Sequence, residues 1–275
     1  MKRLTLTLAP VTLLALLASC GPLDDTEAES DVAALAEDSG EASESGDTAN
    51  ALNSIPVEPI TDPTQLGSPE SAAQAAGTAP TFFKPAGCIV ATRAAGVVTY
   101  EFKGCTGPFG LVGVNGKLVA TFSPAAVGTL AVAVKSDGLV IGKTPVEHSA
   151  SGTISFKGTQ RIVAWTSTTK GILARSGAAI EHKASYSGTY DVATECVALD
   201  GTASTTWGIH GVQSTVVGYQ RCGSGGVCPT AGTITATGLL SKLSITITYL
   251  GNGRAQLTTP KGRVFDYKMA WCAVP

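Results

Sequence analysis

The chain has 275 residues with a formal net charge of −2, and 44% of its residues are hydrophobic. This near-neutral balance gives no overall signal for a nucleic-acid partner. The charges are unevenly distributed along the chain. Residues 21–80 hold thirteen acidic residues and no Lys or Arg, whereas residues 81–275 hold 17 Lys and Arg against 8 Asp and Glu. The sequence therefore predicts an acidic segment followed by a basic domain with a net charge of +9.

The first 20 residues have the order of a secretory signal. Lys2 and Arg3 precede an apolar run over residues 4–17, and small residues follow that run. The run is too short to cross about 30 Å of hydrocarbon as a mature helix. The tetrapeptide Leu17-Ala18-Ser19-Cys20 resembles the lipobox of bacterial lipoproteins. This resemblance implies that residues 1–19 are cleaved, and that Cys20 receives diacylglycerol on its thiol and an acyl chain such as palmitate on its new amine.

The lipobox resemblance also implies a location. In diderm bacteria an aspartate directly after the cysteine tends to retain lipoproteins in the inner membrane, and Gly21 occupies that position here. We therefore expect the lipid anchor to lie in the outer membrane.

Residues 20–80 differ in composition from the rest of the chain. They are rich in Ala, Ser, Pro and acidic residues, and all aromatic residues of the chain lie at Phe82 or later. A segment of this composition is expected to bury too little apolar area to offset its chain entropy. The sequence predicts a disordered, self-repelling tether over this range.

Residues 81–275 show the period of two that is typical of half-buried antiparallel strands. Val98, Tyr100 and Phe102 share one face, and polar residues alternate with them. The same alternation places Leu243, Ile245, Ile247 and Tyr249 on a common face, and likewise Phe265, Tyr267, Met269 and Trp271. These runs predict strands of an all-β domain.

Turn signals recur between the runs, at Ala95-Gly96, Asn115-Gly116, Asp137-Gly138, Asp200-Gly201, Gly251-Asn252-Gly253 and Lys261-Gly262. Asn-Gly and Asp-Gly supply the positive φ that tight hairpins need. The sequence predicts antiparallel hairpins that form a sandwich, a barrel or a rolled sheet, and it leaves this choice open.

Six cysteines remain once Cys20 is assigned to the lipid: Cys88, Cys105, Cys196, Cys222, Cys228 and Cys272. An even number in an exported domain predicts three disulfides. Cys88 and Cys105 flank a predicted hairpin near Gly96, and Cys196 and Cys222 are equidistant from Ile209 in a predicted turn, which leaves Cys228 for Cys272. The alternative pairs Cys222 with Cys228 and Cys196 with Cys272. A zinc site formed by Cys222, Cys228 and His210 is disfavoured by the wide cysteine spacing and by export.

One internal repeat is visible. The run from Val146 to Ile154 is similar to the run from Ile180 to Tyr190, and each begins with a Glu-His pair after an aliphatic residue. If these strands lie side by side, His148 and His182 share one face, with Glu147 and Glu181 on the other. Two imidazoles can bind zinc or copper, but no third ligand is identifiable, so a structural hairpin is the favoured interpretation and no metal site is assigned.

Candidate catalytic groups form no recognisable motif. Ser149, Ser151 and Ser224 lie in small-residue runs, and none occupies a Gly-x-Ser-x-Gly elbow before a helix. A glycosidase needs two facing carboxylates, and no marked pair exists among Glu101, Glu147, Glu181, Asp191, Glu195 and Asp266. Trp165, Trp207 and Trp271 have rings that stack on sugars in other proteins, although most Trp side chains are core residues. The sequence assigns no catalytic residue and no cofactor.

The cysteine spacing, the Gly- and Thr-rich strands and the Cys-x5-Cys-Pro run at residues 222–229 resemble envelope lipoproteins of the myxobacterial kind. This resemblance implies a cell compartment and no activity. We expect a non-enzymatic, membrane-anchored envelope lipoprotein whose β domain binds or scaffolds other components. A carbohydrate-active hydrolase of the envelope is the alternative. The expected partners are the membrane, through the N-terminal lipid, and an anionic envelope polymer; nucleic acid is excluded by export.

Overall fold

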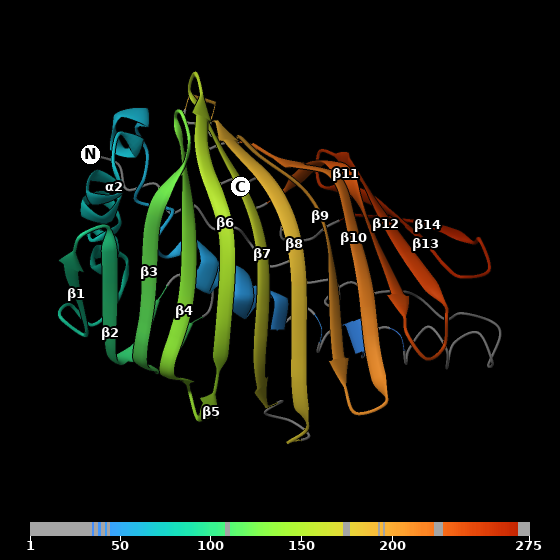
Figure 1. Ribbon diagram of the computed structural model, residues 1–275. Helices are drawn as coiled ribbons and strands as arrows, with labels where there is room; N and C mark the ends of the chain where they lie inside the picture. The colour runs from blue at the N-terminus through green and yellow to red at the C-terminus, as the bar shows by residue number, and fades with distance from the viewer. Residues whose placement is uncertain are drawn as a thin grey trace.

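The computed structural model describes residues 35, 38–39, 42, 45–107, 111–172, 177–191, 193–194, 196–222 and 228–268. These residues form one antiparallel sheet of fourteen strands, in which strands that follow each other in sequence are neighbours in space, and the two-residue β5 pairs with β4. The sheet is curved and does not close into a barrel, so β1 and β14 are its two edges (Figure 1). The all-β prediction is confirmed, and of the three predicted arrangements the chain adopts the rolled sheet.

The strands are β1 (Ile89–Ala94), β2 (Val97–Cys105), β3 (Val114–Ala126), β4 (Thr129–Ile141), β5 (Thr144–Pro145), β6 (Glu147–Lys157), β7 (Gln160–Ile172), β8 (Ala179–Asp191), β9 (Cys196–Trp207), β10 (His210–Arg221), β11 (Pro229–Gly238), β12 (Ser244–Gly251), β13 (Arg254–Thr258) and β14 (Val264–Lys268). Three short helices precede them: η2 (Pro63–Leu66), α2 (Pro69–Ala76) and η3 (Ala79–Phe82). Residues 45–54 form a further helix, which we call the central helix. It lies across the concave side of the sheet (Figure 1).

The predicted strand faces match the observed burial. Tyr100 and Phe102 of β2 are buried together with Val98, and Ile245 and Ile247 of β12 are each about 1% exposed. Phe265 of β14 packs against the same core as β12. Met269, Trp271 and the Tyr267 side chain, which complete the last predicted face, lie outside the described residues.

Three predicted turns are wrong, because their glycines lie inside strands. Gly116 belongs to β3 and Gly138 to β4, with positive φ values of 97° and 57°. A Cβ on Gly116 would collide with the carbonyl of Gly138 across the strand pair, and the register shifts at this point. The pair thus forms an irregularity of the bulge type rather than two turns. Asp200-Gly201 similarly lies within β9, where Gly201 faces Tyr186 of β8.

The predicted tether over residues 20–80 is wrong from residue 45 onward. Ala49, Leu52 and Ile60 are essentially fully buried, and residues 51–83 contribute to the core beneath β1–β6. The segment needs no aromatic residue of its own, because the sheet supplies large side chains such as Tyr100, whose hydroxyl donates to the carbonyl of Ala76 at 2.9 Å. Averaging over residues 20–80 obscured the apolar run from residue 49 to residue 60.

This correction also changes the charge balance of the folded unit. Asp47, Glu58, Asp62 and Glu70 belong to the segment that packs on the sheet. Counted over residues 45–275, the excess of Lys and Arg over Asp and Glu falls from nine to five. Cys20 and its lipobox lie outside the described residues, and no helix among those described has the length and apolar character to span a bilayer.

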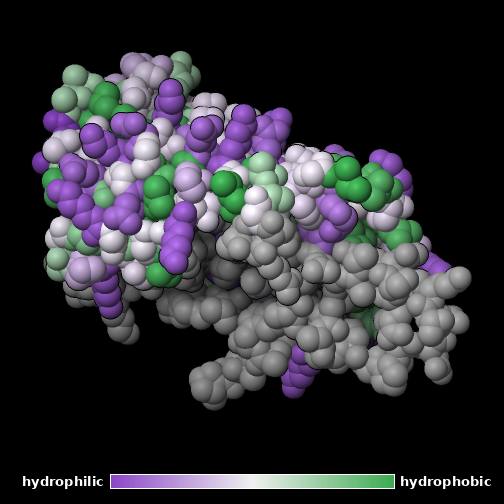
Figure 2. Space-filling view, turned by 90° about the horizontal axis from the view of Figure 1, so that it is seen from below, coloured by the Kyte–Doolittle hydropathy of each residue, from purple (hydrophilic) through white to green (hydrophobic). Residues whose placement is uncertain are grey.

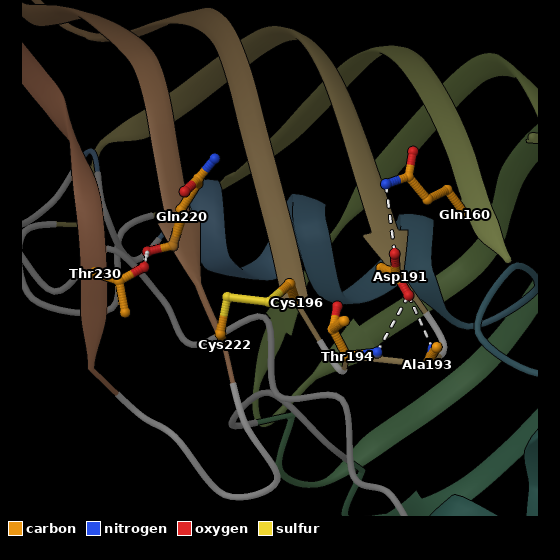
Figure 3. The surroundings of a disulfide bond; sticks show 8 residues. All are labelled: Gln160, Asp191, Ala193, Thr194, Cys196, Gln220, Cys222 and Thr230. Carbon is orange, nitrogen blue, oxygen red and sulfur yellow. Dashed lines mark hydrogen bonds between the residues drawn. A yellow bond between two sulfur atoms is a disulfide. The ribbon is translucent and has the colours of Figure 1, made fainter.

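Disulfides join neighbouring strands as predicted. Cys88 is bonded to Cys105, and Cys196 is bonded to Cys222 at the ends of β9 and β10 (Figure 3). The second bond excludes the alternative pairing of Cys222 with Cys228 and also a zinc site that uses Cys222. Cys228 is disulfide-bonded as well, whereas Cys272 lies outside the described residues. Bridges that close 17 and 26 residues each stabilise the fold by about 3 kcal/mol, through restriction of the unfolded chain.

Candidate functional site

The two histidines of the internal repeat lie on the concave face, close to the central helix. Thr169 of β7 pairs with His148 of β6 on one side and with His182 of β8 on the other. Both imidazoles are buried, whereas Glu147 is exposed and Glu181 half-buried at the alternate, outer positions of their strands. The histidines share one face and the glutamates the other, as predicted, but their strands are not side by side, because β7 lies between β6 and β8.

His148 connects the sheet to the central helix. Its Nε2 lies 3.0 Å from Oδ1 of Asn53, and its Nδ1 lies 2.8 Å from Oγ1 of Thr169. The amide oxygen of Asn53 only accepts, so the imidazole carries its proton on Nε2, and Nδ1 accepts from the threonine hydroxyl. Burial, with a smaller contribution from the nearby His182, lowers the pKa of His148 to about 4. The ring is therefore neutral at pH 7.

His182 repeats this arrangement without a helix side chain as partner. Its Nδ1 lies 2.8 Å from Oγ1 of Thr205, and its Nε2 has no hydrogen-bond partner among the described residues. The ring lies against Gly46 of the central helix, where an added Cβ would come within 3.3 Å of Cε1. Burial lowers the pKa of His182 to about 4 as well. Because each ring packs under the helix, the geometry fits a role in holding the helix on the sheet.

Small cavities lie between the central helix and the sheet. Two have volumes of about 100 Å³ and 70 Å³ and are both lined by Asn50 and Tyr186, and another, of about 110 Å³, is lined by Ser45 and Thr48 of the helix. Cavities this small are below the size of ordinary small-molecule sites. The concave face is thus largely filled by the chain's own N-terminal segment, so the outer face is where a ligand has room to bind.

A much larger hollow lies on the outer face over β6–β9. Its volume is about 640 Å³, and it is widely open to solvent. Its lining is dominated by hydroxyl side chains: Ser151, Thr153, Thr166, Ser185, Ser187 and Thr202. Gly152, Trp165, Tyr186 and Gly201 form one row across its floor. The two glycines leave room for the neighbouring rings, since a Cβ on Gly152 would lie 2.7 Å from Cε3 of Trp165.

The hollow is part of a continuous row of hydroxyl side chains, which we call the hydroxyl ladder. The register places one Ser or Thr from each of eight neighbouring strands in line, from β6 to β13: Ser151, Thr166, Ser185, Thr202, Thr215, Thr235, Thr246 and Thr258. Two neighbouring pairs in the ladder are hydrogen-bonded through their hydroxyls, with 3.1 Å between the oxygens of Ser151 and Thr166 and of Thr235 and Thr246. Strand spacing sets the backbones of successive ladder residues about 4.8 Å apart.

Charged groups near the hollow are balanced. Asp200 is the one carboxylate among the described residues that line it, and Asp200 Oδ1 accepts from the amide of Gly218 at 2.6 Å. Lys183 precedes Ser185 by two residues and lies on the same face of β8, and its Nζ is 2.7 Å from Oε2 of Glu181. That hydrogen bond is the main cause of the lowered pKa of Glu181. The site therefore offers many neutral donors and acceptors and little net charge.

The residues considered from sequence for catalysis are not brought together. Ser149 and Ser151 lie on the outer face of β6, Trp165 is half-buried and Trp207 is buried, while Ser224, Glu195 and Trp271 lie outside the described residues. Sequence reasoning missed the hydroxyl ladder, because each Ser or Thr is ordinary in a solvent-facing strand position. The sequence signal is the recurrence of such residues at alternate positions in almost every strand, but the register that aligns them depends on how the strands pair. No protein family, curated protein or solved structure matches this chain.

Proposed function

We propose that the chain is a lipid-anchored protein of the bacterial cell envelope whose outer sheet face binds a neutral polysaccharide. The lipobox resemblance at Cys20 and the disulfides support export and anchoring. The observation that carries the binding role is the hydroxyl-lined hollow over the β6–β9 part of the hydroxyl ladder. The myxobacterial resemblance is consistent with this proposal and adds no activity to it.

Hydroxyl side chains suit a polysaccharide because each one both donates and accepts a hydrogen bond, as does each sugar hydroxyl. Rows of such groups on a rigid sheet cost little conformational entropy when a ligand binds. The balanced charge around the hollow favours a neutral polymer over the anionic polymer expected from a +9 domain. Carboxylate placement also favours binding over hydrolysis, since Asp200 is the single acid among the described lining residues, and a glycosidase needs two.

Removing two hydroxyls from the hollow is expected to weaken polysaccharide binding about thirtyfold. Thr166→Val and Thr202→Val keep the shape and strand preference of the side chains while each removes a hydrogen bond of about 1 kcal/mol. Affinity electrophoresis through gels containing neutral hexose polymers, followed by calorimetry with a six-unit oligosaccharide, would measure the change.

The matched control is the pair Thr235→Val and Thr246→Val. These residues belong to the same hydroxyl ladder and share a hydrogen bond of the same length as Ser151 and Thr166, but they lie outside the hollow. The control should bind as the native protein does. Equal losses in both pairs, or binding by neither the native protein nor its variants, would refute the proposed site.

Lipid anchoring has its own test. Replacing Cys20 with Ser removes the thiol that would accept diacylglycerol, so the exported protein should move from the membrane fraction to the soluble fraction or accumulate as a precursor. Mass spectrometry of the native protein should find the acylated N-terminal peptide at Cys20. An unmodified mature N-terminus at any other residue would contradict the lipoprotein assignment.

A further inference from the structure

Large apolar side chains are exposed along one end of the sheet, which we call the lower rim and which comprises residues 112, 142–144, 172, 208–210 and 239–242. Val112, Ile172, Ile209 and Leu240 are all exposed there, with Ile209 at 78% and Leu240 at 64%. Each belongs to a different loop or strand end. Seen from below, apolar and hydrophilic residues are interspersed over the described part of this side of the molecule (Figure 2).

The register shows that these positions belong to the same end of the sheet. Trp207 of β9 pairs with His210 of β10 and with Ile180 of β8. The β9–β10 turn, which contains Ile209, therefore lies at the same end of the sheet as the start of β8. The amide of Leu239 donates to the carbonyl of Gly211, which places the β11–β12 turn beside it. At the other side, the amide of Gly142 donates to the carbonyl of Val112.

Cations accompany the apolar tips. Lys143 lies in the turn between β4 and β5, and Lys242 lies in the turn after β11, next to Leu240; both are exposed. Lys103 and Lys170 are close to the same end, where they pair with Glu101 and Glu181. Exposed apolar tips interspersed with Lys form the composition that partitions into the headgroup region of an anionic bilayer.

The described part of the N-terminal segment begins at this rim. Leu35 packs against Gly238 at the end of β11, where an added Cβ would lie 3.2 Å from Cδ1 of Leu35. Oδ1 of Asp38 lies 3.5 Å from Nδ1 of His210 at the start of β10. Fifteen residues separate Leu35 from Cys20, so a lipid on Cys20 lies within about 50 Å of the rim.

We infer that the lower rim is a second membrane contact, in which Ile172, Ile209 and Leu240 insert into the headgroup region of a bilayer that contains anionic lipid. This contact needs no lipid on Cys20, and it goes beyond the proposed polysaccharide binding. It would hold the long axis of the strands upright on the membrane and leave the hollow on the outer face accessible.

The test uses the full mature chain with Cys20→Ser, so that any vesicle binding comes from the protein surface. Flotation with vesicles of phosphatidylethanolamine and phosphatidylglycerol should recover this protein, and vesicles of phosphatidylcholine alone should recover less. Ile209→Ser with Leu240→Ser should lower partitioning to the anionic vesicles about a hundredfold, or tenfold for each apolar tip withdrawn from the interface. Lys143→Glu with Lys242→Glu should lower binding to the anionic vesicles and leave that to phosphatidylcholine unchanged.

The control variant changes the opposite end of the sheet. Val127 in the β3–β4 turn and Leu250 at the end of β12 are also exposed, so Val127→Ser with Leu250→Ser removes comparable apolar area. This variant should bind vesicles as the Cys20→Ser protein does, and circular dichroism should show that all variants are folded. Loss of binding in the control, equal binding by the rim variant, or no binding by the Cys20→Ser protein would overturn the inference. The polysaccharide assay is unaffected by these changes, so the two proposals fail independently.

Discussion

Lowering the pH from 7 to 4 is expected to reduce the free energy of unfolding by about 6 kcal/mol through His148 and His182 alone. Each imidazole has a pKa near 4 when folded, against an ordinary value of 6.5. Between these values the unfolded chain binds more protons than the folded chain. The contribution of the two histidines to the free energy of unfolding is therefore fully present above pH 6.5. It is lost as the pH falls toward 4, by about 3 kcal/mol for each histidine.

The measurement is urea unfolding at pH 7 and pH 4, compared between the native protein and a His148→Gln, His182→Gln double variant. Carboxylates such as Asp191, whose pKa is lowered chiefly by the amide of Thr194, titrate in both proteins, so the difference isolates the imidazoles. The double variant should show a pH dependence smaller by about 6 kcal/mol. Parallel pH curves for the native protein and the double variant would contradict the assignment.

Replacing Arg161 with Met is expected to destabilise the fold by about 3 kcal/mol. The Nη1 of Arg161 donates to the carbonyls of Val57, Glu58 and Ile60, at 3.1, 3.1 and 2.8 Å, and thereby fixes the chain where it leaves the central helix. Its guanidinium also lies over the ring of Tyr190, 5.3 Å from the centroid. Methionine fills similar space but leaves the three carbonyls without this donor, while relief of the buried charge offsets part of the loss.

Arg254→Met is the control for this variant, because Arg254 is an exposed residue of β13. Its unfolding free energy should stay within about 0.5 kcal/mol of the native value. Chemical denaturation at pH 7 would measure both variants. Proteolysis at low protease concentration should also cut the Arg161→Met protein first within residues 45–60. Equal stability of the two variants would show that Arg161 does not hold this segment.

The strand faces could be predicted from sequence because their cause is local. Alternation at Val98, Tyr100 and Phe102 records which side of one strand meets the core. The role of residues 45–60 could not be predicted in this way, because the side chains that bury Leu52 and Ile60 come from strands far along the chain. The glycines at 116, 138 and 201 misled for the same reason, because a turn signal describes only adjacent residues. Gly116 and Gly201 leave room for a cross-strand neighbour, and Gly138 has the positive φ of the irregularity opposite Gly116.

The candidate site shows the same division. The internal repeat correctly predicted that His148 and His182 share a face, since a period of two fixes side-chain direction within each strand. It could not indicate Asn53 as the partner of His148, because these residues are 95 positions apart. The hydroxyl ladder depends on the register of eight strands, and a shift of one residue in any of them would turn its hydroxyl to the concave face.

Hydrogen–deuterium exchange with a bound neutral oligosaccharide tests the central claim most directly. If the hydroxyl-lined hollow is the binding site, ligand should slow exchange in peptides from β6 to β9 that contain Ser151, Thr166, Ser185 and Thr202, and the Thr166→Val, Thr202→Val protein should lose this protection. Peptides from β11 to β13 and from the central helix should exchange at unchanged rates. Protection confined to the central helix and its contacts on the concave face, or no protection at saturating ligand, would contradict the account.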